Sequence, residues 1–131
     1  MKIKNFREWH HKKRTLHNKK ARPFFHRREV WFCSLGENIG FEQDGGGKQF
    51  LRPVIVIKKF NNQVFWALPL TKTAKTGKYY YKLQVSNRKE KSTVILSQFR
   101  LVDAKRLQYK IGDLTEKDFL ETKKRIISLL Q

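Results

Sequence analysis

One apolar run constrains the fold of this chain more than any other segment. Residues 54–57 read Val-Ile-Val-Ile, and four consecutive β-branched side chains favour a strand buried on both faces over a helix. Arg52 and Pro53 precede this run, so a buried strand would hold the Arg52 guanidinium at its entrance. Directly upstream, residues 40–48 are rich in glycine and charge, which predicts a mobile polar loop close to Arg52. A fixed cation beneath a flexible polar loop predicts a phosphate site.

The overall charge limits the kinds of partner. The 131 residues include 30 lysines and arginines against 11 aspartates and glutamates, a formal net charge of +19. This balance predicts a polyanionic partner, with nucleic acid as the first candidate and an anionic membrane as the second. No apolar run approaches the roughly 20 residues that span a membrane, and the basic N-terminus lacks the features of a secretory signal. We therefore expect a soluble, intracellular chain with one domain and an appendage.

The first 28 residues form the predicted appendage, a basic arm. They hold eleven lysines and arginines against one acid, Glu8. Four apolar residues of the arm recur near helical spacing, at Ile3, Phe6, Trp9 and Leu16. The spacing predicts a short helix over residues 5–17. Two interpretations are open: an arm that binds nucleic acid, or a helix docked on the domain by Phe6 and Trp9, with docking favoured.

Cysteine and histidine point away from redox and metal chemistry. The single cysteine, Cys33, lies in an apolar segment, which predicts a small buried side chain rather than a reactive thiol. All four histidines lie in the basic arm without cysteine or carboxylate at ligand spacing, so we expect no metal site. Phosphate-binding loops of nucleotide hydrolases, paired-histidine zinc motifs, Cys-x-x-Cys and Gly-x-Ser-x-Gly are all absent from the sequence.

From residue 29 onward the pattern is that of short strands. We expect strands over residues 29–35, 51–60, 64–70, 78–85 and 93–97, with a continuation over 99–102. Asn61 and Asn62 favour a tight hairpin, which makes the first three strands an antiparallel meander. Pro69 is expected to lie at a sheet edge or at the end of the third strand. Thr71 then follows just beyond the sheet. This pattern predicts a small barrel.

The end of the chain reads as helical. Residues 104–107 predict one short helical turn before Ile111. Thr115 followed by Asp118 predicts the start of a C-terminal helix. Its apolar stripe, expected to pack on the barrel, comprises Phe119, Leu120, Ile126, Ile127 and Leu130 with Lys123.

Five blocks in order resemble the MazF/PemK toxin family. They are residues 30–35 with 40–43, then 52–57, 67–71, 94–107 and 111–114 with the helix that follows. The resemblance covers residues 29–130, and the arm of residues 1–28 lies outside it. Two positions depart from part of the family, since Phe41 and Ser97 stand where some members carry histidine and an acid.

The resemblance implies a fold and a function. The fold is mainly β: an SH3-like antiparallel barrel over residues 29–131 with a C-terminal helix, assembled as a homodimer. The function is that of a type II toxin in the cytoplasm, an endoribonuclease that cuts single-stranded RNA such as mRNA without metal or cofactor. Its implied partners are RNA and an acidic antitoxin, with DNA reached only through that antitoxin and no membrane. Trp31 and Trp66 are expected in the core or at the dimer interface.

The resemblance also assigns site residues by position. Arg52 and Thr71 match the proposed catalytic arginine and hydroxyl residue of the family. The residues expected to bind RNA are Glu42, Gln43, Lys48 and Gln98.

The chemistry can be weighed from the residue types. Attack by the 2′-hydroxyl of RNA on its own phosphate needs a proton acceptor, a proton donor and positive charge on the phosphate. Arg52 suits two of these needs, the charge and the proton donation, because a guanidinium holds its proton too tightly to act as a base. Thr71 would donate a hydrogen bond to a phosphate oxygen. The proton acceptor stays open, with Glu42 as the nearest acidic candidate.

The alternative function is a non-catalytic basic RNA-binding module on the same fold. Phe41 and Ser97 are compatible with it. On this interpretation Arg52 binds Asp103 or a backbone carbonyl, and Thr71 merely ends a strand.

Overall fold

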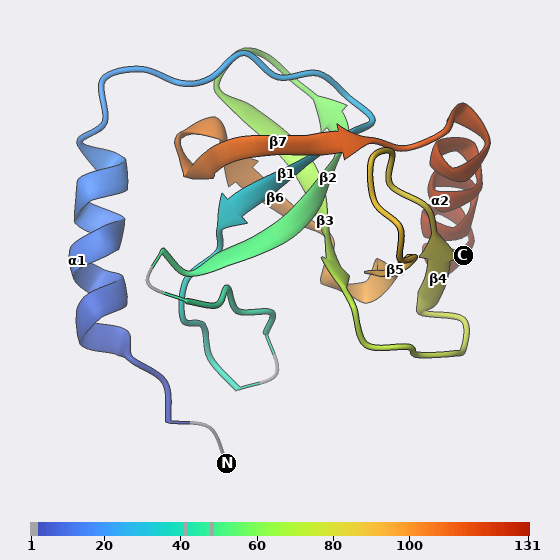
Figure 1. Ribbon diagram of the computed structural model, residues 1–131, viewed down its shortest axis with the longest axis horizontal. Helices are drawn as coiled ribbons and strands as arrows, with labels where there is room; N and C mark the ends of the chain where they lie inside the picture. The colour runs from blue at the N-terminus through green and yellow to red at the C-terminus, as the bar shows by residue number, and fades with distance from the viewer. Residues whose placement is uncertain (1–2, 41, 48) are drawn as a thin grey trace.

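The chain folds as one curved antiparallel sheet with a helix on either side, as Figure 1 shows. The structure is a computed structural model that describes residues 3–40, 42–47 and 49–131. The helices are α1 (Phe6–His17) and α2 (Glu116–Leu129). The strands are β1 (Glu29–Ser34), β2 (Leu51–Lys59), β3 (Val64–Thr71), β4 (Tyr80–Leu83), β5 (Ser92–Ile95), β6 (Arg100–Asp103) and β7 (Leu107–Asp113). Short 3-10 turns at Leu96–Gln98 and Ala104–Arg106 precede β6 and β7.

Strand pairing confirms the mainly β fold. The strand order is β4, β5, β3, β2, β1, β7, and β6 also pairs with β3. The first three strands form the expected meander, and the Asn61 side chain accepts hydrogen bonds from the backbone of Gln63 and Val64 in its hairpin. Within the described ranges, β4 and β7 do not pair along their length, but an isolated bridge joins Val85 to Leu114 just past them. The sheet is therefore barrel-like without being closed.

The run at residues 54–57 is buried on both faces, as predicted. Its two valines belong to the hydrophobic cluster around Phe65, and its two isoleucines to the cluster around Leu68 and Phe119. Each such side chain contributes about 1.5–3 kcal/mol through burial. On the neighbouring β1, burial raises the pKa of the Cys33 thiol to about 12, as expected for a packing residue. Strand β2 thus joins both halves of the core and fixes the position of Arg52 at its start.

One of two expectations about β3 is wrong. The strand lies inside the sheet, and Pro69 lies near its end, two residues before its last residue, in line with the expected terminus. Proline is tolerated because β3 changes partner there: residues 64–67 pair with β6 and residues 70–71 with β5. Thr71 does not lie beyond the sheet, because it is the last residue of β3 and pairs with Thr93.

Strand β7 is the element that sequence patterns do not reveal. The expected helical turn is present at Ala104–Arg106, but the chain then continues as a strand that pairs with β1. Because β7 lies at a sheet edge, Tyr109 and Lys110 are exposed in its middle. It therefore lacks both a continuous apolar run and a strict alternation.

The N-terminal arm forms helix α1, which docks on the sheet domain through two residues. Trp9 and Leu16 are buried against Phe50. The Arg106 guanidinium lies over the Trp9 ring at 5.6 Å. Phe6 is 51% exposed, so its expected role as an anchor is wrong. Trp9 and Leu16 are seven residues apart and therefore lie on one stripe of the helix. The docked face is narrow for this reason.

The segment after α1 is also held by polar contacts. Arg22 donates two hydrogen bonds of 2.9 Å to the carboxylate of Asp103. These bonds lower the pKa of Asp103. Lys105 donates to the carbonyl of His17 at the end of the helix. Polar contacts therefore hold the end of α1, at His17, and the segment after it, at Arg22, to the domain.

Helix α2 begins as predicted but packs only part of its stripe. The Thr115 side chain accepts a hydrogen bond from the backbone N–H of Asp118. Phe119 is buried, whereas Leu120, Ile127 and Leu130 are at least half exposed. Neither of the two described helices is long and apolar enough to cross a membrane.

The glycine at position 36 should prove essential for docking of the arm. Gly36 has a φ of +84°, and a Cβ there would lie 1.9 Å from the Trp9 ring. We expect Gly36→Ala to displace Trp9 and to lower the free energy of unfolding by about 1–3 kcal/mol more than a strain-matched control. The control is Gly47→Ala, at a φ of +72° with open space around it. Urea unfolding followed by tryptophan fluorescence measures both, and equal losses would contradict this account of docking.

Candidate active site

Arg52 lies at the start of β2, half-buried and held by backbone carbonyls. Its Nε donates to the carbonyl of Asp44 at 2.5 Å, and its Nη1 donates to the carbonyl of Leu70 at 3.1 Å. With the Gln43 amide oriented to match its neighbours, the Gln43 side-chain oxygen accepts from Nη2 at 2.9 Å. A guanidinium has five N–H groups. Among the described residues, one N–H on Nη1 and one on Nη2 therefore have no acceptor beside these three partners.

Arg52 keeps its positive charge although it is half-buried. Burial lowers the pKa of Arg52, and the nearby Asp44 carboxylate acts in the opposite direction. Because an arginine pKa starts above about 12, the side chain remains a cation at neutral pH. The site thus presents a fixed positive charge with two donors that no described residue accepts.

Thr71 follows Leu70, whose carbonyl accepts a hydrogen bond from Arg52. The pairing of β2 with β3 ends at Val54 and Pro69, and the same register continued by two residues along each strand would bring Arg52 opposite Thr71. The hydrogen bond from Arg52 to the Leu70 carbonyl joins the two strand ends directly. The Thr71 hydroxyl oxygen accepts from the backbone N–H of Thr73 at 3.2 Å. Its own hydrogen points to no acceptor that the described residues provide.

The β1–β2 loop and the turn after β5 complete the cluster. The backbone N–H of Gln43 donates to the side-chain oxygen of Gln98 at 3.4 Å. Gln43 therefore connects Gln98 with Arg52. The Glu42 carboxylate turns back on its own loop and accepts from the backbone N–H of Ile39 at 2.9 Å. Phe41 and Lys48, both named from the sequence, lie outside the described residues.

One lysine of the arm belongs to this network and has no local signal in the sequence. The Lys4 ammonium donates to the carbonyls of Asn38 and Gly40 and lies 3.0 Å from the Asp44 carboxylate. The same carboxylate accepts from the backbone N–H of Asn38 at 2.6 Å. The Asp44 carbonyl accepts a hydrogen bond from Arg52, and the Asp44 carboxylate pairs with Lys4, so Asp44 links Lys4 to Arg52. The loop, expected to be mobile, is thus tied down from the arm.

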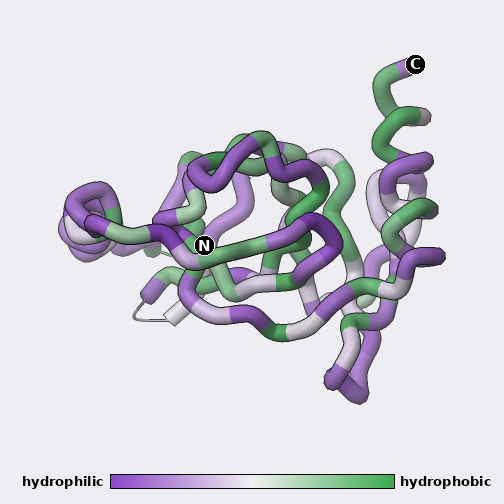
Figure 2. Tube along the Cα trace, turned by 90° about the horizontal axis from the view of Figure 1, so that it is seen from above, coloured by the Kyte–Doolittle hydropathy of each residue, from purple (hydrophilic) through white to green (hydrophobic). Residues whose placement is uncertain are grey.

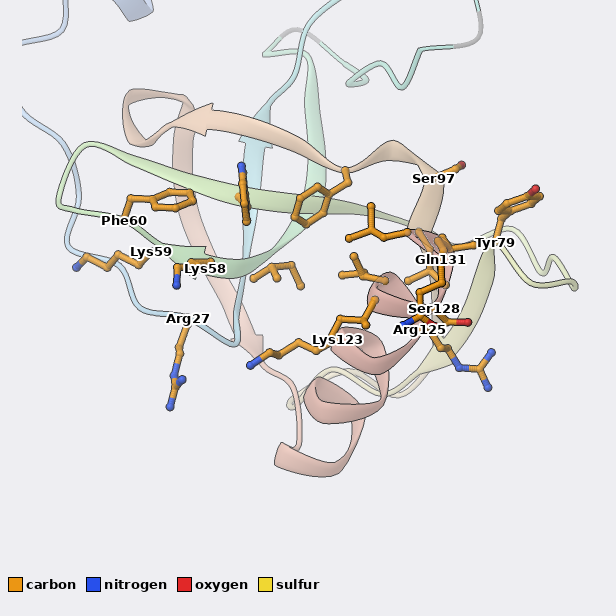
Figure 3. A pocket seen from close by; sticks show the side chains of 18 of the residues that line it. Arg27, Lys58, Lys59, Phe60, Tyr79, Ser97, Lys123, Arg125, Ser128 and Gln131 are labelled. Carbon is orange, nitrogen blue, oxygen red and sulfur yellow. The ribbon is translucent and has the colours of Figure 1, made fainter.

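A separate groove lies between the sheet and the C-terminal end of α2, as Figure 3 shows. Its volume is about 1550 Å³. Ile57, Trp66 and Phe99 belong to its apolar lining, and Arg52 and Thr71 do not line it. The cations that line it are Arg27, Lys58, Lys59, Lys78, Lys123 and Arg125. The groove and the Arg52 cluster are therefore two distinct surfaces.

The family follows from the sequence match over the domain that carries this cluster. Residues 26–130 match the model of PemK-like, MazF-like toxins of type II toxin–antitoxin systems. The chain belongs to this family. Arg52, Thr71, Gln43 and Gln98 all lie within the matched range, and α1 lies before it. No curated protein matches the chain.

Solved structures show the same fold at low sequence identity. MazF from Deinococcus radiodurans is 19% identical with a TM-score of 0.62, over 85% of this chain and 98% of that chain. An endoribonuclease from a Mycobacterial species, solved in complex with its cognate antitoxin, is 15% identical with a TM-score of 0.62. That alignment covers 82% of this chain and 95% of the other. The Mycobacterium tuberculosis toxin MazF-mt6 is 15% identical with a TM-score of 0.61, covering 79% and 96%.

Removing the Lys4 ammonium should loosen the loop beside Arg52. In Lys4→Met, the Asp44 carboxylate and two carbonyls lose their charged donor, which is worth about 1.5–3 kcal/mol for such hydrogen bonds. We expect hydrogen exchange at the backbone N–H groups of Asn38 and Gly45 to rise at least about tenfold. Lys20→Met is the matched control, because Lys20 is exposed and makes no ion pair with the described residues. Unchanged exchange in Lys4→Met would rule out this connection.

Proposed function

We propose that this chain is the toxin of a type II toxin–antitoxin system and acts as an endoribonuclease on single-stranded RNA. The observation that carries the proposal is the half-buried Arg52 cation, bound to the carbonyl of Leu70 next to Thr71, with two N–H groups that no described residue accepts. A net charge of +19 favours a polyanionic substrate. Membership of the toxin family supports the same reaction class.

The reaction that suits this cluster is cleavage by the substrate's own 2′-hydroxyl. The 2′-oxygen forms a bond to the adjacent phosphorus while the bond from phosphorus to the 5′-oxygen breaks. The 2′ proton passes to a base, and the leaving 5′-oxygen gains a proton. The products then carry a 2′,3′-cyclic phosphate and a 5′-hydroxyl, and neither metal nor cofactor takes part.

Arg52 and Thr71 act on the phosphate in this scheme. Negative charge grows on the non-bridging oxygens as the fifth oxygen arrives, and preorganised donors stabilise it. In this scheme the two N–H groups of Arg52 that no described residue accepts donate to non-bridging oxygens of the phosphate. Thr71 donates its hydroxyl hydrogen to a phosphate oxygen. Because Arg52 is already held in place, little reorganisation is needed when the phosphate binds.

The remaining site residues bind RNA around the phosphate. Gln43 and Gln98 offer amide groups next to Arg52, and Lys48 adds a cation from the same loop. Glu42 is the acidic candidate for the proton acceptor, but its carboxylate accepts from Ile39. It reaches a 2′-hydroxyl only if the loop rearranges, so the base stays open in this scheme.

We propose an acidic antitoxin as the protein partner, with DNA contacted only through it, and the cytoplasm as the location. The charge of +19 makes a basic toxin attractive to an acidic protein. We also propose a homodimer, with a second copy covering the groove beside α2. Ile127 and Leu130 are 56% and 82% exposed there, and Trp66 is 39% exposed. Monomers seldom leave a contiguous apolar surface of this kind in water.

Loss of Arg52 should abolish cleavage. We expect Arg52→Ala to lower the rate by at least about 100-fold, because a preorganised charged donor is lost from the transition state. Arg52→Lys should recover only part of the activity, since an ammonium lacks the planar fork. The assay uses labelled single-stranded RNA in chelator, with the product ends identified and folding checked by circular dichroism. Arg27→Ala, in the groove, is the matched control.

The same assay decides between the two candidate functions. Full-rate cleavage by Arg52→Ala would overturn the mechanism. Wild-type protein that binds RNA tightly and leaves it intact would instead identify the non-catalytic RNA-binding module.

The proposed dimer should dissociate when charge enters the groove. We expect Ile127→Glu to shift the protein from dimer to monomer in light scattering after gel filtration, because a buried carboxylate at an interface is costly. Ile3→Glu is the matched control, since Ile3 is 93% exposed and does not line the groove. A wild-type monomer at micromolar concentration would contradict the proposed dimer.

A further inference from the structure

The outer face of α1 is strongly basic and forms no ion pair with the described residues. Glu8 is the only acid among residues 1–28. None of the ion pairs that the described residues form involves the cations of α1 or of the turn after it. These cations are Arg7, Lys12, Lys13, Arg14, Lys19 and Lys20. Figure 2 shows the arm as a mainly hydrophilic segment at the side of the molecule.

Helix geometry separates this basic face from the docked face. Trp9 and Leu16 form the buried stripe of α1. At 100° per residue, Arg7 and Arg14 lie about 150–170° from the centre of this stripe, on the opposite side of the helix, whereas Lys13 lies about 50° from it, beside the docked face. All three side chains are exposed. The helix therefore presents its cations to solvent while its two apolar anchors hold it still.

Such a helix is electrostatically unfavourable by itself. Like charges on a helix surface repel one another and lower helix stability. The chain nevertheless holds this repulsive face in a fixed orientation, through Trp9, Leu16 and the contacts of Lys4. A polyanion is the class of ligand that would relieve the repulsion, and it needs no apolar surface to bind.

The basic face begins next to the candidate active site. Lys4, just before α1, is bonded to the loop that holds Arg52. Phe50, beneath both anchors of the helix, is two residues before Arg52 in the sequence. The helix of 12 residues is about 18 Å long. It extends the positive surface away from the Arg52 cluster, over a length comparable with several nucleotides of RNA backbone. This surface runs along the side of the molecule where Figure 1 shows α1.

We propose that the outer face of α1 is a second RNA-binding surface, which holds the phosphates that flank the cleaved bond. This inference rests on the proposed function for its placement beside the cleaved bond. The face binds phosphates and reads no bases, because its lysine and arginine side chains are flexible cations. It should therefore strengthen binding of long RNAs in a salt-dependent way and leave short ones unaffected.

The test removes three charges from α1 and compares them with three removed elsewhere. The arm variant is Arg7→Gln/Lys13→Gln/Arg14→Gln. The control variant, at exposed lysines without ion pairs to the described residues, is Lys91→Gln/Lys117→Gln/Lys124→Gln. Both carry the same net charge, so non-specific attraction falls equally. Circular dichroism and thermal unfolding establish that both fold.

Binding is measured with an RNA of about 30 nucleotides and one of about 5 nucleotides, lengths above and below a typical single-strand site. The arm variant should lose at least about tenfold in affinity for the long RNA, and the slope of log K against log salt should fall by about 2. The control variant should lose much less. Cleavage of the short RNA should be unchanged in both variants.

The outcomes separate this inference from the proposed function. Equal losses in the arm and control variants would overturn the inference while cleavage by the wild type upholds the function. Wild-type protein that cuts neither RNA, but needs the arm to bind the long one, would remove the function and support the RNA surface. If the arm variant binds RNA normally and loses binding to polyglutamate, the face belongs to an acidic protein and the inference fails.

Discussion

A half-buried guanidinium needs acceptors for the N–H groups that face the protein, and this requirement organises the whole site. The alternating core contacts of β2 hold Arg52 in place, where desolvation makes an unpaired N–H costly. The partners come from three parts of the chain: Asp44 and Gln43 from the loop, and Leu70 from β3. Each of these segments is thereby tied to the same cation. The loop closes on Arg52 because the arginine needs acceptors there.

The arm extends this arrangement beyond the family domain. Lys4 neutralises Asp44, so the residue whose carbonyl accepts from Arg52 does not leave an uncompensated carboxylate beside that cation. Without that cation, the Asp44 carboxylate would repel an incoming phosphate and compete for Arg52. The arm thus acts on the electrostatics of the site as well as on the position of the loop.

Features with local causes could be predicted from sequence, and features that depend on distant partners could not. The burial of residues 54–57 and the Thr115 helix start follow from side-chain types within a few positions. Strand β7 depends on an edge of β1 that only the folded sheet provides. The ion pair between Lys4 and Asp44 joins residues 40 apart, and nothing local distinguishes Lys4 from the ten other cations of the arm. Gln98 came from the family resemblance, whereas Arg52 was already indicated by its place before the buried run, and the structure connects the two through Gln43.

The groove beside α2 and the outer face of α1 differ in their surface chemistry, so each suits a different kind of partner. The groove beside α2 combines exposed Ile127 and Leu130 with cations at its rim, so a ligand gains from burying apolar area there. The outer face of α1 offers charge without apolar area. A protein surface can supply both shape and apolar contact, which suits the groove. A single RNA strand supplies a regular series of phosphates. Cations such as Arg7 and Arg14, which form no ion pair with the described residues, can bind phosphates without any apolar contact.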